Sequence, residues 1–416
     1  MTYNESVQYI HSLLKFGIKP GLERISVLMN ELGNPQSELK FIHIAGTNGK
    51  GTTSTMMSEI LKAAGHKTGL FTSPYVFDFC ERIQINNKNI PQTELAEIVS
   101  EVKTAVDKIS NSGIEPTEFE VITAAALLYF HKQKCDYVVL EVGLGGRYDS
   151  TNIISPPLAA IITSISLDHT KILGDTTGQI AYEKCGIIKS GSNVITTDKQ
   201  DKDAFSVIKK TAAEVNADLS VGKVQDVKIL SENIYGTDIE LGGLKIHIPF
   251  VGRHQIENTV SAVTAAKAIN INDEFIKSGI ENTVIHARME IIGRQPLVML
   301  DGGHNPECAE ALAEVLKDFA KDCNITVLIG MMADKDCKKY LSKILPLSNK
   351  CIVTVPENPR SLSGEELKNL SKEFIDDVKI IQNSKEAYAF AKAETGKDGM
   401  LLVCGSFYLI SDIFHT

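Results

Sequence analysis

The chain has 416 residues, of which 43% are hydrophobic and 23% are charged, and its net charge is -9. This length exceeds one ordinary hydrophobic core, so we expect two or three domains. The acidic balance argues against a nucleic-acid-binding surface, and no apolar run is long enough for a membrane span. The eight cysteines are scattered without a CxxC pair, which is typical of reduced thiols in a cytoplasmic protein.

The first half of the chain alternates predicted helices with short apolar strands. Residues 3–32 are amphipathic, are broken at Lys19-Pro20-Gly21, and lack the basic start and apolar core of a signal peptide. After Ser73-Pro74, alternating apolar and polar residues predict a short hairpin or a mobile loop over 76–90. The other expected elements are strands at 41–44, 68–72, 137–141 and 158–165, and helices at 52–64, 91–110, 117–130 and up to 186.

The second half begins with the least regular segment, 193–250, which looks strand-rich, and continues with a small-residue helix at 255–268. After Arg288 the strand–helix alternation starts again, with strands expected at 297–301, 326–330, 351–355 and 400–404. Unbroken apolar strands between helices are typical of a mostly parallel sheet covered on both faces. We therefore predict an α/β fold with a large domain at residues 1–287 and a smaller Rossmann-like α/β domain at 288–416.

A glycine-rich turn joins the first strand to its helix and carries one lysine. Backbone N–H groups and the positive end of a helix converge there, which suits a phosphate group. Lys50 would reach the outer phosphates, and the Thr52 hydroxyl could ligate magnesium. The spacing is shorter than the common phosphate-loop pattern, so a turn without a ligand is the alternative. We favour nucleotide binding and call the turn, residues 46–51 (Gly-Thr-Asn-Gly-Lys-Gly), the phosphate loop.

Polar residues follow several of the predicted strands. Ser73, Glu141 and His169 each come after an apolar strand, and the carboxyl ends of parallel strands form the edge where ligands bind. A hydroxyl, a carboxylate and an imidazole beside Thr52 could hold magnesium next to a nucleotide. Singly, each residue is better explained as a cap or a turn residue. Their common edge beside the phosphate loop favours a metal site.

Two further positions have competing explanations. Lys184 lies on a predicted helix, where a lysine is usually a solvated surface residue. Asp301 and His304 stand at the end of a strand in the second domain, where they could close a site between the domains. The alternative is that Asn305-Pro306 merely starts the next helix.

Taken together, these motifs resemble the folylpolyglutamate synthase and dihydrofolate synthase family of the Mur-ligase-like superfamily. The matching segments run in family order and include the shortened phosphate loop. They are HIAGTNGKGTTS (43–54), TSPYVFDFCERI (72–83), PTEFEVITAAALLYF (116–130), EVGLGGRYDSTN (141–152), TSISLDHTKILGDT (163–176), EKCGIIK (183–189), GRHQIENT (252–259) and DGGHNP (301–306).

The resemblance implies an ATP-dependent ligase that adds L-glutamate to reduced folates, and to dihydropteroate in some members, through an acyl phosphate. ATP is the cosubstrate, two magnesium ions are expected, and a monovalent cation is a further expectation. The resemblance identifies the large domain as the phosphate-loop ATPase domain and the small domain as the glutamate-ligase domain. We expect a cytoplasmic monomer whose partners are small molecules, with no nucleic acid and no membrane.

The resemblance also assigns roles to individual residues. Lys50, His304 and a carbamylated Lys184 are the implied catalytic residues. Those implied for ATP are Gly46, Thr47, Asn48, Gly49, Lys50, Gly51, Thr52, Asn258, Arg288 and Asp301. The metal set is Thr52, Ser73, Glu141, His169 and Lys184. The folate-side set is Tyr75, Arg82, Thr117, Glu118, Phe119, Tyr148 and Asp149.

Three departures from the family pattern leave the ligand-type side chains in place. Tyr75 stands where many relatives have histidine, His286-Ala287 replaces Pro-Gly before Arg288, and Gly303 replaces a commoner alanine. Because Tyr75 replaces this histidine, the sequence does not assign the pterin that the site prefers. The alternatives are another Mur-type ligase that acts on a cell-wall nucleotide precursor, or a non-catalytic ATP-binding protein. The segments at 116–130 and 163–176 argue against the first, and the retained Lys50 and metal residues argue against the second.

Overall fold

The computed structural model describes residues 1–17 and 19–414, so the last two residues of the predicted second domain lie outside the described residues. Three sheets organise the chain, and the first is a mostly parallel eight-stranded sheet. Its order is β4 (Lys88–Asn89), β3 (Ile83–Ile85), β2 (Thr68–Phe71), β5 (Tyr137–Glu141), β1 (Phe41–Ala45), β6 (Ala159–Ile162), β7 (Asn193–Thr197) and β8 (Asp218–Gly222). β3 and β4 form an antiparallel hairpin, which confirms that alternative for the 76–90 segment.

The other two sheets come later in the chain. A three-stranded antiparallel sheet has the order β11 (Leu244–Ile248), β10 (Gly236–Leu241) and β9 (Lys228–Asn233). The third sheet has the order β12 (Glu290–Arg294), β13 (Leu297–Asp301), β17 (Met400–Cys404), β14 (Ile325–Ile329), β15 (Lys350–Val353) and β16 (Val378–Ile380). It is parallel except for β12, as expected for a Rossmann-like unit. The predicted α/β fold is therefore confirmed.

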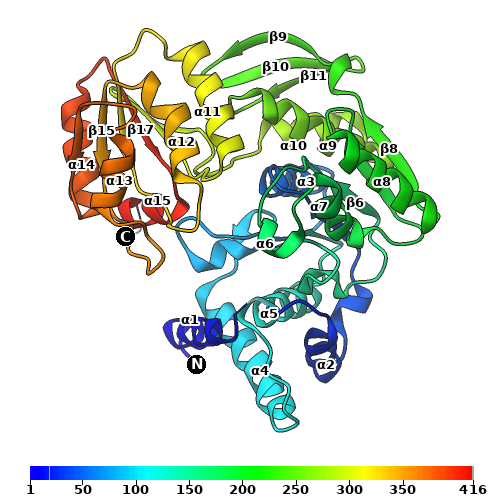
Figure 1. Cartoon of the computed structure of the whole chain (residues 1–416). Coiled ribbons are helices and arrows are strands. Elements are labelled where there is room, and N and C mark those ends of the chain that lie inside the picture. Colours follow the sequence, from blue (N-terminus) through cyan, green and yellow to red (C-terminus); the bar gives the residue numbers. More distant parts are fainter. Residues whose placement is uncertain (18, 415–416) are drawn as a thin grey trace.

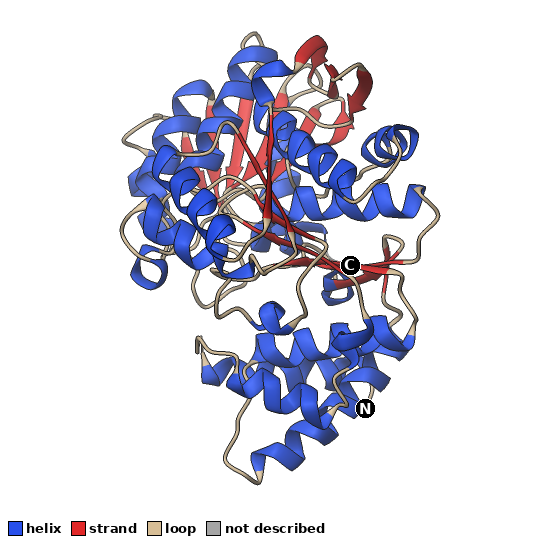
Figure 2. Cartoon of the chain, turned by 90° about the vertical axis from the view of Figure 1, so that its right-hand side faces the viewer, coloured by secondary structure: helices blue, strands red, loops and turns tan. Residues whose placement is uncertain are grey.

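Helices cover the faces of both large sheets (Figures 1 and 2). Those in the first part of the chain are α1 (Tyr3–Ser12), α2 (Glu23–Glu31), α3 (Lys50–Ala63), α4 (Gln92–Ser110), α5 (Glu118–Lys132), α6 (Thr170–Leu173), α7 (Thr177–Lys184), α8 (Lys202–Glu214), α9 (Arg253–Ala268) and α10 (Asp273–Glu281). Those around the third sheet are α11 (Pro306–Phe319), α12 (Cys337–Ile344), α13 (Gly364–Ser371), α14 (Ser384–Thr395) and α15 (Phe407–Phe414). Among the described helices, none combines the length and apolar character needed to cross a bilayer.

Short 3₁₀ turns join several of these elements. They are Leu13–Phe16, Pro35–Glu38, Phe79–Arg82, Ser150–Ile153, Cys185–Ile187, Val224–Asp226 and Leu345–Leu347. In Figure 1, α1, α2, α4 and α5 gather below the first sheet, while the yellow-to-red segment forms a separate body at the upper left. The apolar core under the first sheet includes buried residues of these helices, such as Phe130 of α5, together with Phe41 of β1 and Phe71 of β2.

One helix starts earlier than expected, and another lies in a segment where no helix is predicted. The helix after the phosphate loop begins at Lys50, two residues before Thr52, because Gly49 adopts the left-handed conformation (φ 82°) that turns the chain. Residues 193–250 contain five strands, β7 to β11, which confirms the expectation of a strand-rich segment, and they also contain the helix α8. Ala204, Ile208 and Ala212 of α8 are buried, and their spacing of four residues is a helical pattern.

α10 packs closely against α3, the helix that follows the phosphate loop. A Cβ atom on Gly279 would lie 2.4 Å from the Ile60 Cα atom and 2.5 Å from its backbone nitrogen. Since the contact is with backbone, side-chain rotation cannot relieve it. A glycine at this position therefore sets the distance between the two helices.

We expect Gly279→Ala to lower the free energy of unfolding by about 1–3 kcal/mol, because the added methyl group pushes α10 away from α3. Gly178→Ala in α7 is the matched control, since its Cβ would meet no heavy atom closer than 3.8 Å. Alanine there should stabilise the helix by up to about 1 kcal/mol. Urea denaturation of both variants checks this, and equal stability of the two would contradict the packing argument.

Candidate active site between the two large sheets

The phosphate loop is shaped by close approaches from two neighbouring segments. A Cβ atom on Gly46 would lie 1.8 Å from Thr163 Oγ1, and one on Gly49 would lie 2.1 Å from Asn258 Oδ1. Hydrogen bonds fix the loop from the same side: Thr47 N donates to Ser164 O (2.8 Å), and Thr163 Oγ1 donates to Asn48 O (2.7 Å). The loop thus leads directly into the positive end of α3, which suits an anion.

Lys50 is the first residue of α3, and its side chain folds back over the phosphate loop. Its Nζ donates to the carbonyl oxygens of Gly46 and Thr47, both at 3.1 Å. It also lines a cleft of about 1080 Å³ whose walls come from both large sheets and their connections. A phosphate bound on the loop would meet this ammonium group without a change in the backbone.

Glu141 ends β5 as a buried carboxylate, and the main-chain N–H of Ser73 donates to its Oε2 at 3.0 Å. Burial raises the pKa of Glu141, while Lys50 and the Ser73 N–H oppose that increase. Among the described residues, no lysine, arginine or histidine nitrogen lies within 4.0 Å of this carboxylate. A buried carboxylate without a counter-cation is costly, so this position is suited to an added cation.

The other members of the predicted metal set lie around Glu141 at different depths. Thr52 is buried on α3, and a Cβ on the adjacent Gly51 would lie only 3.6 Å from Glu141 Oε2. His169 is half exposed beside Asp168, with its Nε2 atom 3.8 Å from Asp168 Oδ2. In the described part of the chain, no group of three or more His, Cys, Asp or Glu side chains is arranged to hold a metal. Oxygen donors such as hydroxyls, carbamate and phosphate would have to complete a shell, and magnesium accepts these.

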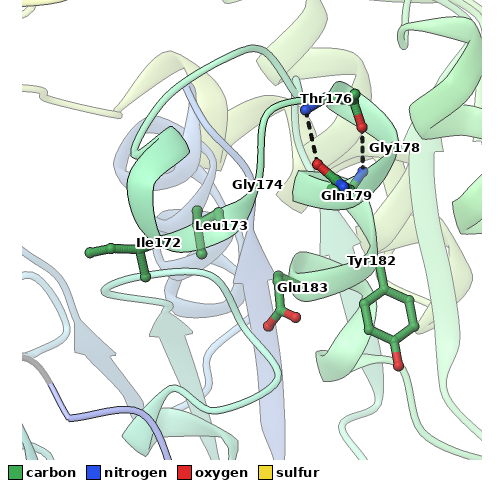
Figure 3. Close-up of a pocket in the computed structure, with 8 residues that line it drawn as sticks. All are labelled: Ile172, Leu173, Gly174, Thr176, Gly178, Gln179, Tyr182 and Glu183. Carbon is green, nitrogen blue, oxygen red and sulfur yellow. Dashed lines mark hydrogen bonds between the residues drawn. The ribbon is translucent and has the colours of Figure 1, made fainter.

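Lys184 is buried, so the expectation of a solvated surface lysine is wrong. It ends α7, which starts with a capping box between Thr176 and Gln179 (Figure 3). Its Nζ donates to Gly46 O at 2.8 Å. Burial, and then the charge of Lys50, lowers the pKa of Lys184 to about 7. A substantial neutral fraction, the form that can accept carbon dioxide, is therefore present near neutral pH.

An open hollow of about 560 Å³ lies beside this helix, between α6 and α7 (Figure 3). It shares Ile172, Leu173 and Glu183 with the large cleft. The Gln179 side chain is already engaged, because its Oε1 accepts from the backbone nitrogens of Asp175 (2.7 Å) and Thr176 (3.3 Å). Because it shares these three lining residues with the large cleft, the hollow forms the outer margin of that cleft.

The structure brings most of the predicted folate-side residues to one wall of the cleft. Those that line it are Arg82, Thr117, Glu118, Phe119, Tyr148 and Asp149. Tyr75 does not line the cleft and instead lies under Arg82, whose guanidinium is 5.1 Å from the Tyr75 ring centroid. Tyr148 is 53% exposed, which leaves its ring available at the surface of the cleft.

Two of these side chains are engaged in local hydrogen bonds. Thr117 caps α5, and its hydroxyl donates to Glu120 Oε2 at 2.9 Å. Asp149 is buried, and its carboxylate accepts from the backbone nitrogens of Thr151 (3.0 Å) and Leu144 (2.9 Å). Both side chains therefore bind neighbouring protein groups and stabilise the wall of the cleft.

The predicted nucleotide residues surround a second, smaller cavity of about 100 Å³ next to the phosphate loop. Asn258, Arg288 and Asp301 line it together with Gly49 and Thr52. Burial raises the pKa of Asp301 to about 6, and its carboxylate accepts from Gly303 N (3.0 Å) and Met289 N (3.2 Å). His304 lines the large cleft, and burial lowers its pKa to about 4, so its imidazole is neutral.

Sequence reasoning missed the contacts that join the phosphate loop to α11. The Asn48 side chain accepts from Asn305 Nδ2 (3.1 Å) and Cys308 Sγ (3.5 Å), and it donates to Glu307. Ser166 donates to the same Glu307 carboxylate. His254, Arg360 and Tyr408 were also missed. The residues on α11 adjoin DGGHNP, and that proximity is the signal that could have identified them.

Comparison with known proteins agrees with this architecture. The Mur ligase middle domain matches residues 44–266, and the Mur ligase glutamate ligase domain matches residues 287–407. The dihydrofolate synthase/folylpolyglutamate synthase of Bacillus subtilis is 35% identical over 99% of this chain and 98% of that protein. The folylpolyglutamate synthase of Lacticaseibacillus casei is 33% identical over 100% and 99%.

A solved structure gives the same result in three dimensions. Mycobacterium tuberculosis folylpolyglutamate synthase, complexed with ADP and AMPPCP, superposes with a TM-score of 0.89 at 30% identity. The match covers 99% of this chain and 98% of that one. The resemblance seen in the sequence is thereby confirmed, and the chain belongs to the folylpolyglutamate synthase/dihydrofolate synthase family of Mur-type ligases.

Proposed function

We propose that this protein uses ATP to join the amine of L-glutamate to the carboxylate of a reduced folate, and that dihydropteroate is a second acceptor. The observation that carries this proposal is the buried, unpaired Glu141 carboxylate beside the phosphate loop, at the base of a cleft of about 1080 Å³. A cleft of this size suits a large planar substrate lying next to a nucleotide. Relatives that carry both enzyme names support the choice of substrates.

The reaction requires activation of a carboxylate. Its oxygen attacks the γ-phosphorus of ATP, ADP leaves, and a mixed anhydride forms. The amine of glutamate then attacks the carbonyl carbon, phosphate leaves, and the amine loses a proton. Lys50 and the N-terminus of α3 offset the phosphate charge, and the neutral His304 imidazole lines the same cleft.

The described residues fit magnesium. Thr52, Ser73 and Glu141 would hold one ion, and His169 with a carbamylated Lys184 would help to hold a second. When bound, magnesium neutralises phosphate charge. We also propose that a monovalent cation is a further cofactor. The boundary between the two domains is proposed to lie between residues 287 and 288, and the protein is proposed to be a cytoplasmic monomer. Asn258, Arg288 and Asp301 would contact the nucleotide from the small cavity.

The choice of acceptor is tested by ADP release from the full chain with ATP, magnesium and L-glutamate. Tetrahydrofolate should stimulate release, because its chain presents a free carboxylate. Stimulation by dihydropteroate as well would identify a bifunctional enzyme. If neither acceptor stimulates ADP release while a cell-wall nucleotide precursor does, the alternative Mur-type ligase is correct and the proposal is wrong.

Lys50→Ala should lower the rate of ADP release by at least about a hundred-fold, since the cation that faces the phosphates is lost. Lys62→Ala, at the other end of α3, is the control, because Lys62 pairs with Glu59 at 3.2 Å and its side chain is 42% exposed. Circular dichroism should show both variants folded. Turnover by Lys50→Ala equal to that of the control would refute its role.

Glu141→Gln keeps the shape of the side chain and removes its charge. Without magnesium, we expect the melting temperature to rise by about 2 °C or more, because a buried unpaired charge is removed. Magnesium and ADP together should stabilise the wild type by roughly 2–3 kcal/mol at saturation and the variant much less. Differential scanning calorimetry provides this measurement. Equal stabilisation of both proteins would exclude Glu141 as a metal ligand.

A further inference from the structure

The linker between α10 and β12, residues 282–289, contains two residues in a backbone conformation that side chains disfavour. Ala287 and Met289 have φ values of 54° and 50°, and both residues are buried. In this left-handed conformation the Cβ atom lies too close to the following carbonyl oxygen, so residues other than glycine adopt it at a cost in free energy. Such a backbone persists where the surrounding structure fixes it. The contacts of the linker therefore decide its shape.

Glu290, the first residue of β12, holds the linker with its carboxylate. Its Oε2 accepts from Ala287 N at 2.8 Å, and its Oε1 accepts from His286 Nδ1 at 2.9 Å. Burial would raise the pKa of Glu290, but these two hydrogen bonds outweigh burial and lower that pKa, so the carboxylate is charged at neutral pH. The His286 ring also packs edge-on against Phe77 of the first body, with ring centroids 5.7 Å apart. A charged acceptor makes the stronger kind of hydrogen bond, so Glu290 stabilises the disfavoured turn.

Two further hydrogen bonds join the linker to the end of β13. Gly302 N donates to Ala287 O at 2.8 Å, and Met289 N donates to Asp301 Oδ2 at 3.2 Å. Both left-handed residues are therefore fixed by contacts with the second body. The residue between them, Arg288, is held on either side.

Arg288 is the side chain that this turn presents to the site. It lines the cleft of about 1080 Å³ and the small cavity of about 100 Å³. Its guanidinium lies 4.6 Å from the ring centroid of Phe407. In the described part of the chain, no carboxylate oxygen lies within 4.0 Å of this guanidinium group. Since it has no such ion pair, its direction depends on the backbone turn around it.

We propose that Glu290 is a positioning residue for Arg288: its carboxylate holds the linker in the disfavoured turn and so keeps the guanidinium at the small cavity. This inference rests on the proposed function, in which Arg288 contacts the nucleotide. Without the carboxylate, the linker relaxes to commoner backbone conformations, and only a fraction of the molecules presents Arg288. The apparent affinity for a nucleotide falls in proportion to that fraction.

The test measures the dissociation constant of ADP with magnesium by isothermal titration calorimetry on the full chain at neutral pH. Glu290→Ala removes both acceptor oxygens, so we expect this constant to rise by about ten-fold or more. Glu290→Gln keeps one acceptor and should give an intermediate value. It also keeps the shape of the side chain, so it remains informative if Glu290→Ala misfolds. Dissociation constants of both variants within about two-fold of the wild type would overturn the proposal.

Glycine at position 287 separates positioning from a general loss of stability. Glycine adopts the left-handed conformation readily, so Ala287→Gly added to Glu290→Ala should lower the dissociation constant by about three-fold or more. Lys134→Gly is the matched control, because Lys134 is also left-handed (φ 53°) but follows α5, outside the linker. Added to Glu290→Ala, it should leave the dissociation constant unchanged.

A failure of Ala287→Gly to lower the constant would overturn the proposal, because a more flexible residue cannot repair a general loss of stability. A wild type that does not bind ADP would overturn the proposed function and this inference together. A wild type that binds ADP no better than the Glu290 variants would overturn this inference alone.

Discussion

The site depends on how closely Thr163, just after β6, and Asn258, on α9, approach the phosphate loop. Thr163 and Asn258 occupy the space that side chains at Gly46 and Gly49 would need, so the backbone itself forms the surface of the loop. The same approach brings Asn258 beside the small cavity and the Gly46 carbonyl within reach of Lys184. A larger residue at either glycine would displace the loop from α3 and separate these groups. The residues predicted to bind the nucleotide, the cleft and α7 are therefore arranged around one tightly packed turn.

Local sequence patterns predicted the phosphate loop and the polar residues at the adjacent edge of the first sheet. The phosphate loop lies between an apolar strand and a helix, and Ser73 and Glu141 follow strands directly, so topology alone places them at one edge. Lys184 could not be placed in this way. Its burial depends on the phosphate loop and on the Gly143–Gly146 turn, which are distant in sequence, whereas its own helix resembles any surface helix. The helix α8 was missed although its buried residues, Ala204, Ile208 and Ala212, repeat every four positions.

The roles of polar side chains were harder to predict than their positions. Thr117 and Asp149 stand at the cleft as expected, yet their hydrogen bonds are to neighbouring backbone and side-chain groups. Arg82 and Arg360 have the opposite character, because among the described residues no carboxylate oxygen lies within 4.0 Å of either guanidinium group. A sequence shows which side chains carry charge, whereas only the structure shows which charges remain unpaired. This difference separates the residues that build the cleft from those that can bind a ligand in it.

Asn48 belongs to the phosphate loop, yet its side chain is held by Asn305, which caps α11, and by Glu307 and Cys308 in the first turn of that helix. The two bodies cannot move apart without breaking these contacts. By thermodynamic linkage, any ligand that strengthens these contacts of Asn48 also favours the closed arrangement, and domain opening weakens the binding of that ligand by the same factor. For such a ligand, dissociation and separation of the two bodies are coupled steps of one equilibrium.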